Sequence, residues 1–66
     1  MIVGIDVLAE MVGAALEHGA AEYPLRSGAF LILEINGGVQ FLSVKRGSAY
    51  EFVSTVKAVD LIEAEG

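Results

Sequence analysis

Few side chains in this sequence could carry out catalysis. His18 is the single histidine, and there is no cysteine. Nucleophilic catalysis would need His18 as a base beside a serine, and no serine stands at a spacing from it that indicates such a pair. His18 instead precedes Gly19 at the end of a predicted helix, where the helix dipole stabilises a cation. We therefore expect no catalytic residue and a protein that is not an enzyme.

Cofactor and metal sites are not indicated either. A single histidine without any cysteine excludes an ordinary Cys/His zinc site. Gly37, Gly38 and Gly47 mark turns, and none of them opens a helix that carries the Lys-Ser/Thr pair of a phosphate-binding loop. Most carboxylates are explained as solvated surface charge. We expect no cofactor and no metal.

Glu34 is the one carboxylate in an otherwise apolar strand segment. It shares a predicted strand face with Phe30 and Ile32, so its burial would require a partner such as Gln40, a lysine or an arginine. We expect Glu34 to lie at the rim of the sheet, in water.

Charge is unevenly distributed along the chain. The net charge is −5 at pH 7, which argues against a general affinity for nucleic acid. Both ends are acidic, and the basic residues lie between them at Arg26, Lys45, Arg46 and Lys57. An acidic surface suits a basic protein partner, such as the binding groove of a nucleic-acid enzyme, and the protein would then be an inhibitor or adaptor.

Apolar residues at helical spacing predict an amphipathic helix over roughly residues 7–18. The side chains expected on its buried face are Leu8, Met11, Val12, Ala15 and Leu16. We expect Asp6 to cap the helix at its amino end and Gly19 to end it. Ala9 and Gly13 lie one turn apart beside the buried stripe, and small residues at this spacing allow the close approach of a second helix or a strand. The alternative is that Gly13 is tolerated on a solvent-exposed face.

Two apolar segments, residues 29–35 and 39–44, predict a β-hairpin around the turn-forming residues 36–38. A two-residue Asn36-Gly37 loop and a three-residue loop ending at Gly38 are both chemically reasonable. We favour the three-residue loop, because its register places a polar residue opposite a polar one. That register pairs Ile35 with Val39, Glu34 with Gln40, Leu33 with Phe41, Ile32 with Leu42, and Phe30 with Val44.

The remaining segments are a connector and an ambiguous last third. Residues 20–28 are expected to connect the helix to the hairpin. Ser48 to Glu51 has the form of a capping box, which favours a helix from Ala49. The following run of β-branched and aromatic residues favours a strand instead. We predict strands near residues 49–56 and 58–63, with a break around Lys57.

These elements predict a single α+β domain over residues 1–66. It has an N-terminal amphipathic helix followed by an antiparallel β-meander of three to four strands, which can curl into a partial small barrel. In element order this architecture resembles Sm-like and other SH3-like small barrels, some of which bind RNA as oligomeric rings. The resemblance implies an alternative function, an oligomeric barrel that binds nucleic acid or a small ligand. Its candidate nucleic-acid patch comprises Arg26, Lys45, Arg46 and Tyr50.

Apolar side chains on both faces of the predicted sheet are the main indication of function. One helix covers one face, so the other face must close into a barrel or pack on a second subunit, unless the connector and Ile2, Val3 and Ile5 cover it. A chain of 66 residues that is 55% hydrophobic also carries more apolar surface than one small core absorbs. We therefore expect a non-enzymatic protein–protein interaction module that acts as a homo-oligomer, with the sheet face or the acidic helix as its partner surface. The candidate partner-binding residues are Glu10, Gly13, Glu17, Phe30, Ile32, Leu42 and Val44.

The longest wholly apolar run, Ala29 to Leu33, is far shorter than a membrane-spanning helix, and no basic segment opens the chain as in a signal peptide. We expect a cytoplasmic protein without a membrane span. Its expected partners are further copies of itself and a basic protein.

Overall fold

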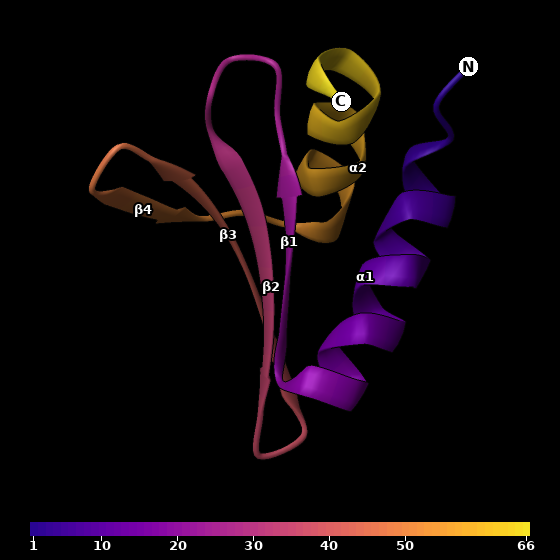
Figure 1. Ribbon diagram of the computed structural model, residues 1–66, viewed down its shortest axis with the longest axis vertical. Helices are drawn as coiled ribbons and strands as arrows, with labels where there is room; N and C mark the ends of the chain where they lie inside the picture. Colours follow the sequence, from indigo (N-terminus) through magenta and orange to yellow (C-terminus); the bar gives the residue numbers. More distant parts are fainter.

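The computed structural model describes residues 1–66 and has a helix at each end of the chain with a four-stranded sheet between them (Figure 1). The elements in chain order are α1 (Gly4–His18), β1 (Ala20–Pro24), β2 (Phe30–Asn36), β3 (Val39–Arg46), β4 (Ala49–Phe52) and α2 (Thr55–Glu65). The strands pair antiparallel in the order β1-β2-β3-β4. This confirms the α+β class and the β-meander, and the sheet is open, with β1 and β4 at its edges.

Both helices lie on the same side of the sheet (Figure 1). The core between them and the sheet consists of 11 buried residues. Its largest fully buried side chains are Leu31 and Leu33 from β2 and Ile62 from α2. The other face of the sheet carries no helix, so its side chains face away from this core.

The helix α1 begins earlier than predicted, at Gly4, and the predicted cap at Asp6 is wrong. Val3 occupies the N-cap position without a side-chain hydrogen bond, and Asp6 lies in the first turn, where its charge complements the helix dipole. The predicted end is confirmed, because Gly19 is left-handed with φ 92° and donates its N–H to the carbonyl of Ala15.

The buried face of α1 is confirmed at Leu8, Met11 and Ala15, and Val12 is partly buried. Leu16 was expected in the same stripe but is 70% exposed. It belongs to a neighbouring stripe with Ile5, Ala9 and Val12, which follows the spacing i, i+4, i+7, i+11 and lies beside the buried face.

The predicted connector over residues 20–28 contains a strand, β1, that the sequence pattern did not reveal. Its Ala21 and Tyr23 lie against the core, opposite Leu33 and Leu31 of β2. Pro24 ends this edge strand, a position where a missing backbone N–H is tolerated.

The predicted register of the β2–β3 hairpin is wrong by one residue. Asn36 pairs with Val39, so the loop is Gly37-Gly38, and both glycines have positive φ, 61° and 79°, as a type I′ turn requires. Leu33 therefore faces Leu42, and Leu31 faces Val44. A one-residue slip moves side chains to the opposite face of a sheet, and this changes which residues are available to a partner.

The predicted strand at residues 58–63 is wrong, because this segment belongs to α2, and β4 ends at Phe52. Ser54 caps the helix by accepting the N–H of Lys57 at 3.1 Å. A helix that begins at Thr55 buries Ala58, Leu61 and Ile62 at i, i+3 and i+4. A helix from Ala49 would carry Asp60 and Glu63 on its stripe of Phe52, Val53, Val56 and Val59, which is why the pattern favoured strands. The helix α2 buries a different stripe.

Candidate protein interaction surface

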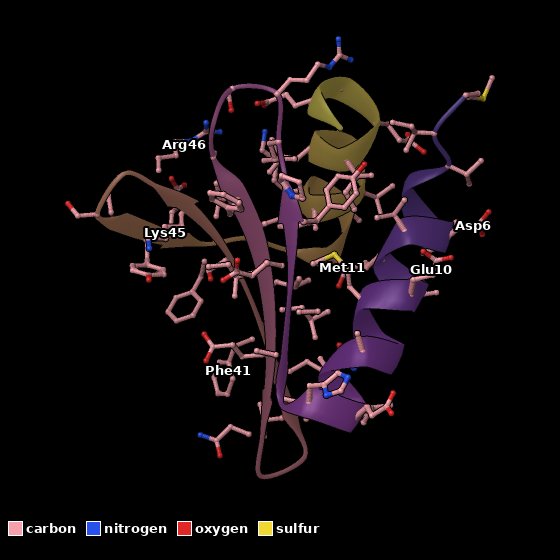
Figure 2. The ribbon with its side chains drawn as sticks, in the orientation of Figure 1. Asp6, Glu10, Met11, Phe41, Lys45 and Arg46 are labelled. Carbon is pink, nitrogen blue, oxygen red and sulfur yellow. The ribbon has the colours of Figure 1, made fainter.

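The strand register defines the face of the sheet opposite the helices, here called the outer face. On each strand it takes alternate residues. Its members are Ala20, Glu22 and Pro24 from β1, Phe30, Ile32, Glu34 and Asn36 from β2, Val39, Phe41, Ser43 and Lys45 from β3, and Tyr50 and Phe52 from β4. Figure 2 shows Phe41 and Lys45 on this side, away from α1.

Four aromatic rings dominate the outer face: Phe30, Phe41, Tyr50 and Phe52. Their exposed fractions range from 40% to 77%, and the centroids of Phe41 and Phe52 lie 6.4 Å apart. With about 200 Å² for a whole aromatic side chain, the four rings leave on the order of 400 Å² in solvent. A patch of this size lies in the range of ~300–600 Å² that is often functional in a monomer.

Ile32 and Ser43 form the floor beneath these rings. They face each other across β2 and β3, and they are only 7% and 5% exposed although no helix covers them. Ile32 is not part of the core between sheet and helices. The outer face therefore has a small buried centre of its own, with larger side chains around it.

A pocket of about 170 Å³ opens on the outer face and is lined by Glu34, Ser43, Tyr50 and Phe52. It exists because Ser43 is small and stands on β3 between the long side chains of Phe41 and Lys45. No buried side-chain oxygen or nitrogen lacks a hydrogen-bond partner, and Ser43 makes no side-chain hydrogen bond. Its hydroxyl therefore opens into the pocket.

Two opposite charges of the outer face, Glu34 and Lys45, form no ion pair within the chain. Glu34 is exposed, as expected, and Lys45 is half-buried with its Nζ 5.5 Å from the centroid of the Tyr50 ring. The one contact of the molecule within ion-pair distance joins His18 Nε2 to Glu17 Oε2 at 4.0 Å; it is an ion pair only when the imidazole is protonated, and both side chains are well exposed. The outer face thus presents Lys45 and two carboxylates, Glu34 beside the aromatic rings and Glu22 on the edge strand β1.

The predicted partner residues of the sheet do not share a face. Phe30 and Ile32 lie on the outer face, whereas Leu42 and Val44 point to the helices, and Val44 is only 4% exposed in the core. The register error caused this, because it paired Ile32 with Leu42 and Phe30 with Val44. It also hid Phe41, which the correct alternation places with Phe30 and Ile32.

The predicted helix residues Glu10, Gly13 and Glu17 do share one exposed stripe of α1, together with Asp6. In Figure 2 the labelled Asp6 and Glu10 point away from the sheet. No atom lies within 4 Å of a Cβ built on Gly13, so the predicted close approach does not occur within the chain. Contact of Gly13 with another chain stays a prediction.

The four residues of the alternative nucleic-acid patch lie at one end of the sheet. Arg26 is in the β1–β2 turn, and Lys45, Arg46 and Tyr50 flank the β3–β4 turn. Arg46 Nη1 donates to Ser27 Oγ at 3.4 Å, which links the two turns. Lys45 and Tyr50 pair across β3 and β4 on the outer face.

No three histidine, aspartate or glutamate side chains come together as potential metal ligands. Neither α1 nor α2 is long and apolar enough to cross a membrane. No protein-family model, curated protein or solved structure matches this chain.

Proposed function

We propose that the chain is a small non-enzymatic protein–protein interaction module that acts as a homo-oligomer, with the outer face as the contact between copies. The observation that carries this proposal is the exposed aromatic cluster of Phe30, Phe41, Tyr50 and Phe52 around the buried Ile32. Interfaces are enriched in aromatic residues at their centre, and hot spots cluster in such well-packed positions.

The low stability expected of so small a domain also favours a second copy of the chain as the partner that covers the outer face. A domain this small gains only about 3–5 kcal/mol from a single hydrophobic core, and this chain has no disulfide to add to it. Burial of the outer face between two copies extends the core across the interface. The roughly 400 Å² of exposed aromatic surface is about half of what each partner buries in a standard interface, and the charged and aliphatic neighbours of the rings supply the remainder.

Assembly through the outer face leaves the acidic stripe of α1 free, because α1 lies on the other side of the sheet (Figure 1). Asp6, Glu10 and Glu17 are all exposed on that stripe. We propose this stripe as the surface for a basic protein partner. Its negative charge would raise the association rate with that partner by electrostatic steering. The oligomer would then act as an inhibitor or adaptor of that partner.

A matched pair of variants tests the contact surface. Phe52 on the outer face is 77% exposed and Leu16 on α1 is 70% exposed, and both are apolar. Phe52→Ser is expected to raise the dimer dissociation constant by about tenfold or more, while Leu16→Ser leaves it unchanged. Sedimentation velocity over a dilution series measures both. Dissociation by Leu16→Ser and not by Phe52→Ser would move the contact to α1 and overturn the proposal.

A second candidate function is the binding of single-stranded nucleic acid on the same face. It is favoured by the Lys45 ammonium beside Tyr50 and by the position of Arg46 at the same end of the sheet. Bases stack on exposed aromatic rings in such sites, and nearby cations hold the phosphates. The net charge of −5 opposes it, so we place it second.

A further inference from the structure

Glu34 and Lys45 occupy equivalent positions about the centre of the outer face. Glu34 pairs with Phe41, and Lys45 pairs with Phe30. The Ile32–Ser43 pair lies midway between these two pairs along the strands. On one face of a strand, side chains recur every second residue. Glu34 therefore lies two residues from Ile32 along β2, and Lys45 lies two residues from Ser43 along β3, toward the opposite end of the sheet.

Neither charge meets an opposite charge within the chain, although Lys45 lies over the ring of Tyr50. Glu34 and Lys45 take part in no ion pair or side-chain hydrogen bond. They lie on opposite sides of the Ile32–Ser43 pair, so one Lys45 does not neutralise the Glu34 of its own chain. Burial of either group in an interface is costly unless an opposite charge from the partner meets it.

The pocket beside Glu34 has the chemistry to receive a cation. Its lining combines the Glu34 carboxylate, the Ser43 hydroxyl and the rings of Tyr50 and Phe52. Carboxylates pair with an ammonium group, and aromatic rings attract cations through their π faces. At about 170 Å³, the pocket is smaller than the ~300–1,000 Å³ of typical ligand sites, so it suits one side chain.

We propose that two copies pack outer face to outer face about a two-fold axis over the Ile32–Ser43 pair, with Lys45 of each copy in the pocket beside Glu34 of the other. A two-fold axis makes every contact occur twice, so the arrangement forms two ion pairs that use both Glu34 and both Lys45 side chains. Glu22, exposed on the edge strand β1, lies at the rim of this contact. This inference rests on the proposed function, because it needs the outer face to be the contact between copies. It adds the symmetry of the dimer and the residues that fix its register.

Charge reversal provides the test. Glu34→Lys alone and Lys45→Glu alone each replace two attractive contacts by two repulsive ones, and each is expected to raise the dissociation constant by about tenfold or more. In an equimolar mixture of the two variants, every cross-chain contact joins opposite charges again. We expect a heterodimer with a dissociation constant within about threefold of the wild-type dimer. Native mass spectrometry with one variant ¹⁵N-labelled identifies the heterodimer.

Glu22 offers a matched control, since it is an exposed carboxylate on the outer face that pairs with Ile32, in the row of the axis itself. A mixture of Glu22→Lys with Lys45→Glu is expected to form no heterodimer of wild-type strength. Circular dichroism checks that each variant is folded, and the milder Glu34→Gln and Lys45→Met mixture replaces any variant that is not. Its heterodimer keeps one of the two ion pairs, so it should bind more weakly than wild type and show a weaker salt dependence than the wild-type dimer.

The outcomes separate this inference from the function on which it rests. A wild-type chain that stays monomeric overturns both. A wild-type dimer that Phe52→Ser dissociates, but whose charge-reversal variants stay dimeric or fail to recover on mixing, overturns the two-fold arrangement alone. Recovery on mixing Glu34→Lys with Lys45→Glu, and none with the Glu22→Lys control, supports it.

Discussion

The backbone N–H of Gly4 donates a 3.0 Å hydrogen bond to Oε2 of Glu63, so the first turn of α1 is capped by the last turns of α2. The contact joins positions 59 residues apart in sequence. It satisfies an amide that has no partner within its own helix, and it places a negative charge at the positive end of the helix dipole. The two ends of the chain thereby stabilise each other on the helical side of the sheet.

Gly4 is expected to be sensitive to a single added methyl group. A Cβ at this position would lie 2.7 Å from the carbonyl oxygen of Val59, which belongs to backbone and cannot easily move. Gly4→Ala should lower the free energy of unfolding by about 1–3 kcal/mol. Gly13→Ala is the matched control on the same helix, since it meets no atom within 4 Å, and it should raise that free energy by up to ~1 kcal/mol through helix propensity.

Urea denaturation followed by circular dichroism measures both glycine variants. Equal effects of Gly4→Ala and Gly13→Ala would contradict the close packing of α1 on α2. A loss of stability and of dimer with Gly13→Ala would place Gly13 in a contact between copies, as the sequence pattern suggested.

Removal of the Glu63 carboxylate should destabilise the start of α1. Glu63→Ala is expected to cost about 1 kcal/mol of unfolding free energy, the usual cost of a lost cap. Glu63→Gln keeps an acceptor oxygen and should cost less. Asp60→Ala on the same helix makes no comparable hydrogen bond and serves as the control. Thermal unfolding at one fixed protein concentration compares the three, and a cost for Asp60→Ala equal to that of Glu63→Ala would argue against the cap.

The parts of the fold that local signals determine were predictable from the sequence. Leu8, Met11 and Ala15 recur at helical spacing, and His18-Gly19 is a local stop signal, so α1 and its end were found. The start of α1 was misplaced because its cap comes from Glu63, at the far end of the chain, and no local pattern reveals such a partner.

The candidate surface was harder to predict, because a shift of one residue in the β2–β3 register changes which side chains lie on the outer face. Three turn-forming residues in succession, Asn36, Gly37 and Gly38, allow loops that differ by one position, and each places Phe41 on a different face. A polar residue at both Glu34 and Gln40 favoured the wrong loop. In the structure Glu34 faces Phe41, because the outer face leaves the carboxylate in water and the polar match is not needed.

The acidic stripe of α1 should control encounter with basic partners. Reversal of two charges, Glu10→Lys with Glu17→Lys, is expected to slow association with a lysine-rich peptide by about tenfold at low ionic strength, and less at high salt. Lys45→Glu with Arg46→Glu is the control, and it should not slow association. Stopped-flow fluorescence measures the rates. Rates that the Glu10 and Glu17 changes leave unaltered would rule out this stripe as the steering surface.

Nucleic-acid binding, the second candidate, predicts a different pattern. Affinity for a short single-stranded RNA would fall steeply with salt and would be lost in the Lys45→Glu, Arg46→Glu variant. The proposed dimer predicts no tight binding at physiological salt, because the aromatic rings that would stack on bases are covered. Fluorescence anisotropy with a labelled oligonucleotide decides between the two, and tight binding that this double variant abolishes would favour the RNA-binding function.

Isotope-filtered NOE spectroscopy on a mixture of labelled and unlabelled protein detects contact between copies of the chain residue by residue. If the copies meet through the outer face, intermolecular NOEs link Phe41, Tyr50 and Phe52, with the Ile32 methyl groups near the centre of the contact. Intermolecular NOEs confined to Ile5, Val12 and Leu16 on α1, or none at millimolar concentration, would contradict it.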